Sequence, residues 1–146
     1  MFSILNNKAK EIICENIKSQ LKQIYPIAGK CRYNYVCHIN AFNDAKKKGQ
    51  KKIVAGFYMY NDSPCIHFYN IDSGGEITDN TLGQCTYQFQ HYIFDSFDVT
   101  NMSIYDLEKE FDAIRKRVAK GLPWYVRLLS NYRALLWIVE KISSVR

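Results

Sequence analysis

Three side chains that together can carry covalent catalysis occur in order along the chain: Cys31, His67 and Asp79. We expect Cys31 in the first turn of a helix, whose N-terminus carries roughly half a positive charge and stabilises a thiolate. Lys30 and Arg32 flank the thiol and act in the same direction. His67 and Asp79 stand on either side of a Ser-Gly-Gly turn, so pairing across a hairpin would let the carboxylate orient the imidazole. The three residue types then match a nucleophile, a base and an orienting acid.

The elements that must position these groups follow from the hydrophobic pattern. Apolar residues recur at helical spacing near both ends of the chain, whereas β-branched and aromatic residues dominate its middle. The expected helices are 6–24, about 31–48, one that opens at the capping-box sequence Ser103–Asp106, and 124–142; the expected strands are 52–60, 65–70, 76–79 and part of 87–97.

The length of 146 residues is typical of one domain. We therefore expect a single α+β domain over residues 1–146, with a core at about 29–100 and helical extensions at both ends. In this arrangement N-terminal helices precede an antiparallel sheet that carries His67 and Asp79. The sheet packs on the helix that bears Cys31, and helices follow at the C-terminus.

Short motifs around the same residues also show a resemblance. They are Cys31-x-x-Asn34, Ile53-Val-Ala-Gly-Phe57, His67-x-x-Asn70 and Gly75-x-x-x-Asp79-x-Thr81. This pattern resembles a group of small bacterial and phage proteins, and in turn the transglutaminase-like and papain-like cysteine enzymes. It covers residues 29 to about 100. Two positions depart from it: Ala55 replaces an acidic residue, and Phe68-Tyr69 replaces an Ala-Trp pair.

The resemblance implies a thiol-dependent amide hydrolase or acyltransferase, either a peptidase, a deamidase or a transglutaminase-like enzyme. Cys31 would be the nucleophile, His67 the base and Asp79 the orienter, while Asn34 and Asn70 would bind substrate or support the site. The substrate would be a peptide or protein amide, and no metal or organic cofactor is implied. The alternative is a non-catalytic phage or bacterial interaction protein on the same fold, which binds a host or virion protein.

The other cysteines and the charge pattern narrow the alternatives. We expect Cys14 and Cys37 to be packing residues, with Cys37 in mid-helix, and Cys65 to share the strand face of His67. Zinc is a less favoured reading, because the cysteines and histidines lack paired knuckle spacing. The net charge is +6, with basic ends around an acidic middle, but no nucleic-acid-binding motif appears, so that partner class is not expected.

The cysteine pattern and the C-terminal segment bear on location and partners. Five irregularly spaced cysteines without a leader-like N-terminus favour free thiols in a reducing cytoplasm, bacterial or of a phage's host. No stretch of about 18 apolar residues predicts a membrane span. The segment Trp124–Ile142 is so apolar that we expect Trp124, Leu128, Leu135 and Trp137 to be buried, against the domain or a second copy of the chain.

Overall fold

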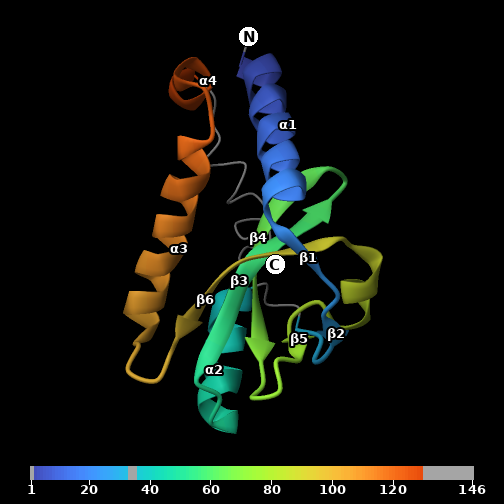
Figure 1. Cartoon of the computed structure of the whole chain (residues 1–146), viewed down its shortest axis with the longest axis vertical. Coiled ribbons are helices and arrows are strands. Elements are labelled where there is room, and N and C mark those ends of the chain that lie inside the picture. The colour runs from blue at the N-terminus through green and yellow to red at the C-terminus, as the bar shows by residue number, and fades with distance from the viewer. Residues whose placement is uncertain (1, 33–35, 130–146) are drawn as a thin grey trace.

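The chain folds into an α+β arrangement in which helices cover a curled six-stranded sheet (Figure 1). This computed structural model describes residues 2–32 and 36–129. The elements in chain order are α1 (Phe2–Gln20), β1 (Lys22–Ile24), β2 (Ile27–Ala28), α2 (Cys37–Lys48), β3 (Lys52–Tyr60), β4 (Ser63–Ile71), β5 (Ile77–Asp79), the 3₁₀ helix η1 (Gly83–Gln88), β6 (His91–Asp98), α3 (Ile104–Lys120) and α4 (Trp124–Leu129).

The centre of the sheet is the β3–β4 hairpin, in which Gly56 lies opposite His67. Asn61 and Asp62 join the two strands, both with positive φ, which is the backbone geometry of the tight turns that match the twist of a hairpin. The strand order is β1-β6-β3-β4-β5-β2. The sheet is mixed rather than purely antiparallel, because β2 pairs parallel with β5.

The sequence predicts the central elements better than those near the N-terminus. The expected strand 52–60 is confirmed as β3. The expected helix 6–24 is wrong at its end, because α1 stops at Gln20 and the residues that follow pair with β6 as β1. The expected helix from about Cys31 is wrong at its start, because α2 begins at Cys37.

One face of the sheet carries the main hydrophobic core. Alternate residues of β3 and β4, among them Phe57 and Phe68, pack against apolar residues of α1, α2 and α3. The opposite face carries a small apolar cluster of Ile24, Val54 and Tyr69. Next to this cluster lies His67, so the sheet separates a helix-covered apolar side from a side with buried polar groups.

The C-terminal part differs from expectation in the residues that the structure describes. The expected capping box is confirmed: Ser103 and Asp106 cap α3 through reciprocal side-chain and backbone hydrogen bonds. In α4, Val126 is buried, whereas Trp124 and Leu128 are 69% and 73% exposed, so their expected burial against the domain is wrong. Leu135 and Trp137 lie outside the described residues. No helix within the described ranges is long and apolar enough to cross a membrane.

Candidate active site

His67 and Asp79 form a buried pair on the side of the sheet away from the main core. The imidazole Nε2 lies 2.9 Å from Asp79 Oδ2, and the two side chains are 2% and 0% exposed. The β4–β5 ladder pairs Asn70 with Thr78, so Asp79 lies just beyond it, where its carboxylate reaches the imidazole. The expected pairing of His67 with Asp79 is present.

The second oxygen of Asp79 is also occupied. Asp79 Oδ1 accepts hydrogen bonds from the backbone N–H groups of Thr81 and Leu82, at 2.9 and 3.0 Å. Burial alone would raise the pKa of this carboxyl, but His67 and the two N–H groups outweigh it and lower the pKa to about 2. Asp79 is therefore an ionised, fixed acceptor at neutral pH.

The imidazole of His67 is cationic at neutral pH, because negatively charged neighbours stabilise its protonated form. Burial disfavours its charged form, but the Asp79 carboxylate and the Cys37 thiol outweigh this effect and raise the pKa of His67 to about 10. The Asp79 hydrogen bond also defines the roles of the ring nitrogens. With Nε2 held by the carboxylate, Nδ1 is the nitrogen that remains for another partner.

The thiol that meets this imidazole belongs to Cys37. Cys37 is the first residue of α2, its side chain is 4% exposed, and its sulfur lies close enough to His67 to raise the pKa of the imidazole. Its Sγ also lies 4.0 Å from the carbonyl oxygen of Ile66, on the strand that carries the histidine. The position at the start of a helix, the positive end of the helix dipole, favours a thiolate.

Cys31 lies elsewhere than the sequence predicts. It is exposed and forms an isolated antiparallel bridge with Leu82, so it is in extended backbone rather than in a helical turn. Its expected place in the first turn of the helix is wrong, because Cys37 holds that place. The neighbours that raise the pKa of His67 are Asp79 and Cys37, and Cys31 is not among them.

A repeated spacing explains why sequence reasoning placed Cys31, rather than Cys37, at the start of the helix. Cys-x-x-Asn occurs twice, as Cys31-x-x-Asn34 and as Cys37-x-x-Asn40, and only the second lies on α2. Asn40 is buried and donates from Nδ2 to Thr81 Oγ1 at 3.0 Å, next to the turn that holds Asp79. The second copy of the spacing was therefore the available signal for Cys37.

Asn70 links the elements around His67 and Asp79 through buried hydrogen bonds. It is buried and donates from Nδ2 to the backbone oxygen of Ala41 in α2, at 2.8 Å. Its Oδ1 accepts from Asn80 Nδ2 at 2.8 Å. Asn70 thus joins the histidine strand to the cysteine helix and to the turn after Asp79. Asn34, the other expected supporting residue, lies outside the described residues.

The segment before α2 is tied to the same turn. The Arg32 backbone N–H donates to Thr81 O at 2.9 Å, and its guanidinium donates to Asn80 O at 2.7 Å. The guanidinium also binds both carboxylate oxygens of Asp44 in α2, at 2.7 and 2.9 Å. Such a two-point contact fixes direction as well as distance, so Arg32 clamps the Asp79 turn to the helix.

The remaining thiols are not placed for the same chemistry. Cys65 shares the strand face of His67, as expected, but burial raises the pKa of its thiol to about 12, so it stays protonated. All five cysteines lie in the described ranges, and none forms a disulfide. Among the residues that the structure describes, no three His, Cys, Asp or Glu side chains gather as a metal site.

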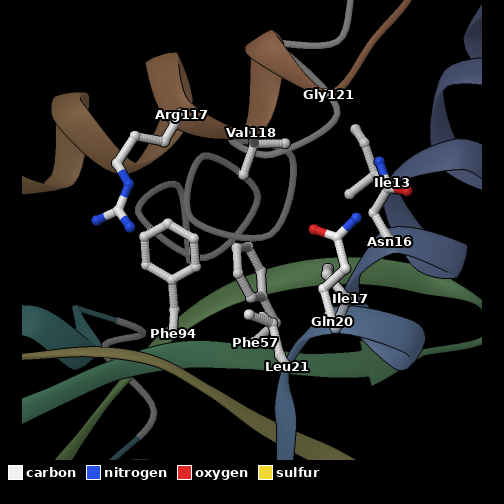
Figure 2. A pocket seen from close by; sticks show the side chains of 10 residues that line it. All are labelled: Ile13, Asn16, Ile17, Gln20, Leu21, Phe57, Phe94, Arg117, Val118 and Gly121. Carbon is white, nitrogen blue, oxygen red and sulfur yellow. The ribbon is translucent and has the colours of Figure 1, made fainter.

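A cavity between α1 and α3 is separate from these residues. It is lined by Ile13, Asn16, Ile17, Gln20, Leu21, Phe57, Phe94, Arg117, Val118 and Gly121. Figure 2 shows the α1 side chains opposite Arg117 and Val118 of α3, with the two phenylalanines on the sheet between them. The cavity lies on the helix-covered face, whereas His67 faces the other side of the sheet.

Comparisons with known proteins give no relative for this arrangement. No family model matches the chain, and no curated protein or solved structure matches it either. The functional conclusion therefore depends on the geometry of Cys37, His67 and Asp79.

Proposed function

We propose that the protein is a thiol-dependent amide hydrolase or acyltransferase in which Cys37 is the nucleophile, His67 the acid–base and Asp79 the orienter. One observation carries the proposal: a single buried imidazole lies 2.9 Å from the Asp79 carboxylate and beside the buried Cys37 thiol at the start of a helix. This is the nucleophile–base–orienter arrangement of covalent catalysis.

The chemistry begins from a thiolate–imidazolium pair. The Cys37 sulfur attacks the amide carbonyl carbon, and the carbonyl π electrons move to its oxygen. The positive end of the α2 dipole would stabilise the charge of this oxyanion. When the C–N bond breaks, His67 gives its proton to the leaving amine. Water or a second amine then attacks the thioester, with neutral His67 accepting its proton, and Cys37 leaves as the thiolate.

Asp79 keeps the imidazole in the orientation that this cycle needs. Its carboxylate holds Nε2–H through both proton transfers, while the two backbone N–H donors prevent it from turning away. The acid does not exchange its own proton in this scheme, which agrees with its low pKa. The proposal places the substrate among peptide or protein amides and the protein in a reducing cytoplasm.

An activated ester tests this proposal without knowledge of the natural substrate. p-Nitrophenyl acetate should acetylate the Cys37 sulfur and release p-nitrophenolate, and mass spectrometry of digested protein should find the acetyl group on Cys37. His67→Ala should abolish this labelling, since the thiolate loses its imidazolium partner. Cys31 and Cys85 are exposed internal references in the same sample.

The distribution of the acetyl group decides the outcome. Acetylation of Cys37 that depends on His67 supports the proposal. Acetylation confined to the exposed cysteines, or unchanged by His67→Ala, contradicts it. Asp112→Asn is a control, because this exposed carboxylate pairs with Arg115 on the next turn of the same helix and its loss should leave labelling unchanged.

A second candidate is the non-catalytic interaction protein, and the burial of the triad favours it. Cys37, His67 and Asp79 are nearly inaccessible, as they would be in a core that has kept a polar network without turnover. The exposed Trp124 and Leu128 of α4 would then belong to a partner-binding surface. Absence of acetylation at Cys37, with the fold intact by circular dichroism, is the result that this candidate predicts.

A further inference from the structure

A second chain of hydrogen bonds runs directly beside the imidazole of His67. The Tyr69 hydroxyl lies 2.7 Å from His91 Nδ1, and His91 Nε2 lies 2.7 Å from the backbone oxygen of Thr86. Because a carbonyl only accepts, Nε2 carries the proton, and Nδ1 accepts from Tyr69. The chain therefore has one direction, from Tyr69 through a neutral His91 to Thr86.

The buried setting keeps that direction fixed. Tyr69 and His91 are both fully buried, on β4 and β6, the two strands that flank β3 in the sheet. Burial lowers the pKa of His91, so the ring stays neutral when His67 is cationic. Burial likewise raises the pKa of Tyr69 well above its ordinary value, so its hydroxyl remains a donor.

Aromatic rings bracket the imidazole with their edges and faces. The Tyr69 and His67 ring centroids are 4.8 Å apart with an interplanar angle of 81°. The Tyr58 ring meets the same imidazole at 5.1 Å and 83°. These contacts restrict rotation of the His67 ring about its own axis, which is the motion that would break its line between Asp79 and Cys37.

The space that Tyr69 occupies depends on a missing side chain. Opposite His67 on β3 stands Gly56, and a Cβ there would lie 2.0 Å from the Tyr92 backbone oxygen and 3.3 Å from Tyr69 Cε2. Phenylalanine and leucine would fill the sites of Tyr69 and His91 without two buried polar groups to satisfy. The hydrogen-bonded pair of Tyr69 and His91 therefore does more than fill space in the core.

We infer that Tyr69, anchored by His91 to the Thr86 carbonyl, is a positioning residue that holds the His67 imidazole between Asp79 and Cys37. The inference rests on the proposed function, because it concerns the same histidine and thiol. Tyr69 touches no reacting atom in it. The hydroxyl–imidazole bond fixes the Tyr69 ring, and the ring fixes the plane of His67.

Four variants separate positioning from simple packing. Tyr69→Phe removes only the hydroxyl, and His91→Leu removes both hydrogen-bonding nitrogens. His91→Gln keeps one acceptor and one donor, so it is the conservative rescue. Tyr92→Phe is the matched control, since it also removes the hydroxyl of a buried tyrosine, one that donates to Gln90 Oε1 at 3.3 Å, away from His67.

The measurement is the rate at which iodoacetamide alkylates Cys37 in the full chain, between about pH 5 and pH 9, with the site mapped by mass spectrometry. We expect Tyr69→Phe and His91→Leu to lower the rate at neutral pH about ten-fold and to move the profile to higher pH. His91→Gln should recover most of the rate, and Tyr92→Phe should match the wild type. Imidazole NMR should show the His67 titration displaced in the two damaging variants.

Two failures are distinguishable. If wild-type Cys37 reacts as His67→Ala does, the proposed function is wrong and the inference falls with it. If wild-type Cys37 depends on His67, but Tyr69→Phe and His91→Leu change only the unfolding temperature, the proposed function stands and the inference is overturned. The pH profile makes this distinction, because a packing defect alone does not change which thiol is ionised.

Discussion

Two cysteines six residues apart occupy opposite kinds of environment in this molecule. Cys31 is exposed in an extended segment that bridges to Leu82, where Gly83 leaves room for it. Cys37 is buried at the first position of α2, beside His67. The reactivity of a thiol depends on its surroundings. The two cysteines are therefore not equivalent, although they are close in sequence and share the Cys-x-x-Asn spacing.

The two regions also do different mechanical work. The segment that contains Arg32 is fastened to the Asp79 turn and to Asp44 of α2. It therefore fixes the distance between the acid's loop and the helix. This restraint also positions Cys37, because it keeps the start of α2 beside β4. The Cys31 region therefore clamps the Asp79 turn to α2, and the Cys37 region is the proposed active site that this clamp keeps in place.

The largest expected effect separates the two thiols directly. Cys37→Ser should lower the rate of p-nitrophenolate release by about a thousand-fold or more, since a hydroxyl is not ionised by an imidazole as a thiol is. Cys31→Ser should leave the rate within about two-fold, because the residue is exposed and outside the His67 hydrogen bonds. If Cys31→Ser lowered the rate more than Cys37→Ser, Cys31 would be the nucleophile, and the contrast drawn between the two cysteines would be wrong.

A smaller but still substantial effect is expected at Asp79. Asp79→Asn should lower the free energy of unfolding by about 3 kcal/mol, because it leaves the buried imidazole without its counter-charge. Urea denaturation of the wild type and variant measures this difference. Asp112→Asn, at an exposed ion pair, should change stability by less than about 0.5 kcal/mol. Equal effects at the two sites would show that the buried pair is not a special feature of the Cys37 region.

The pH dependence of the stability difference between the wild type and Asp79→Asn tests the His67–Asp79 ion pair further. The pKa of Asp79 falls from 3.8 to about 2, so its stabilisation is present above pH 3.8 and is lost as the pH falls through about 2. The pKa of His67 rises from 6.5 to about 10, so its stabilisation is complete below pH 6.5 and is lost as the pH rises through about 10. The stability gap between the wild type and Asp79→Asn should therefore be widest between pH 3.8 and 6.5. A gap that stays constant toward pH 10 would contradict a paired imidazolium.

Sequence reasoning finds the parts of this structure that are encoded locally. The β3–β4 hairpin has strands rich in β-branched and aromatic residues and a two-residue turn with positive φ, and Ser103 and Asp106 form their cap within one turn of helix. His67 and Asp79 are also found, because one short connection links their strands. Each of these features joins residues that are near in sequence.

The features that sequence reasoning misses lack a local signal. Val36 precedes α2 without a capping side-chain hydrogen bond, so no Ser, Thr, Asp or Asn marks the true start of the helix at Cys37. The three residues of β1 and two of β2 become strands only through partners far along the chain, in β6 and β5. Lys30 and Arg32 suggested a reactive Cys31, although Arg32 is committed to the Asp79 turn and Asp44.

The smallest expected effect tests the clamp on its own. Asp44→Asn should lower the free energy of unfolding by about 1–2 kcal/mol, because Arg32 keeps its backbone contacts and part of its guanidinium reaches water. Urea denaturation measures the loss, and hydrogen exchange should show faster exchange at the Arg32 backbone N–H that binds Thr81. Acetylation of Cys37 should change by less than about three-fold, since its bond to His67 is not removed. A loss of acetylation as large as that of Cys37→Ser, with the protein still folded, would show that the clamp and the site are one unit rather than two.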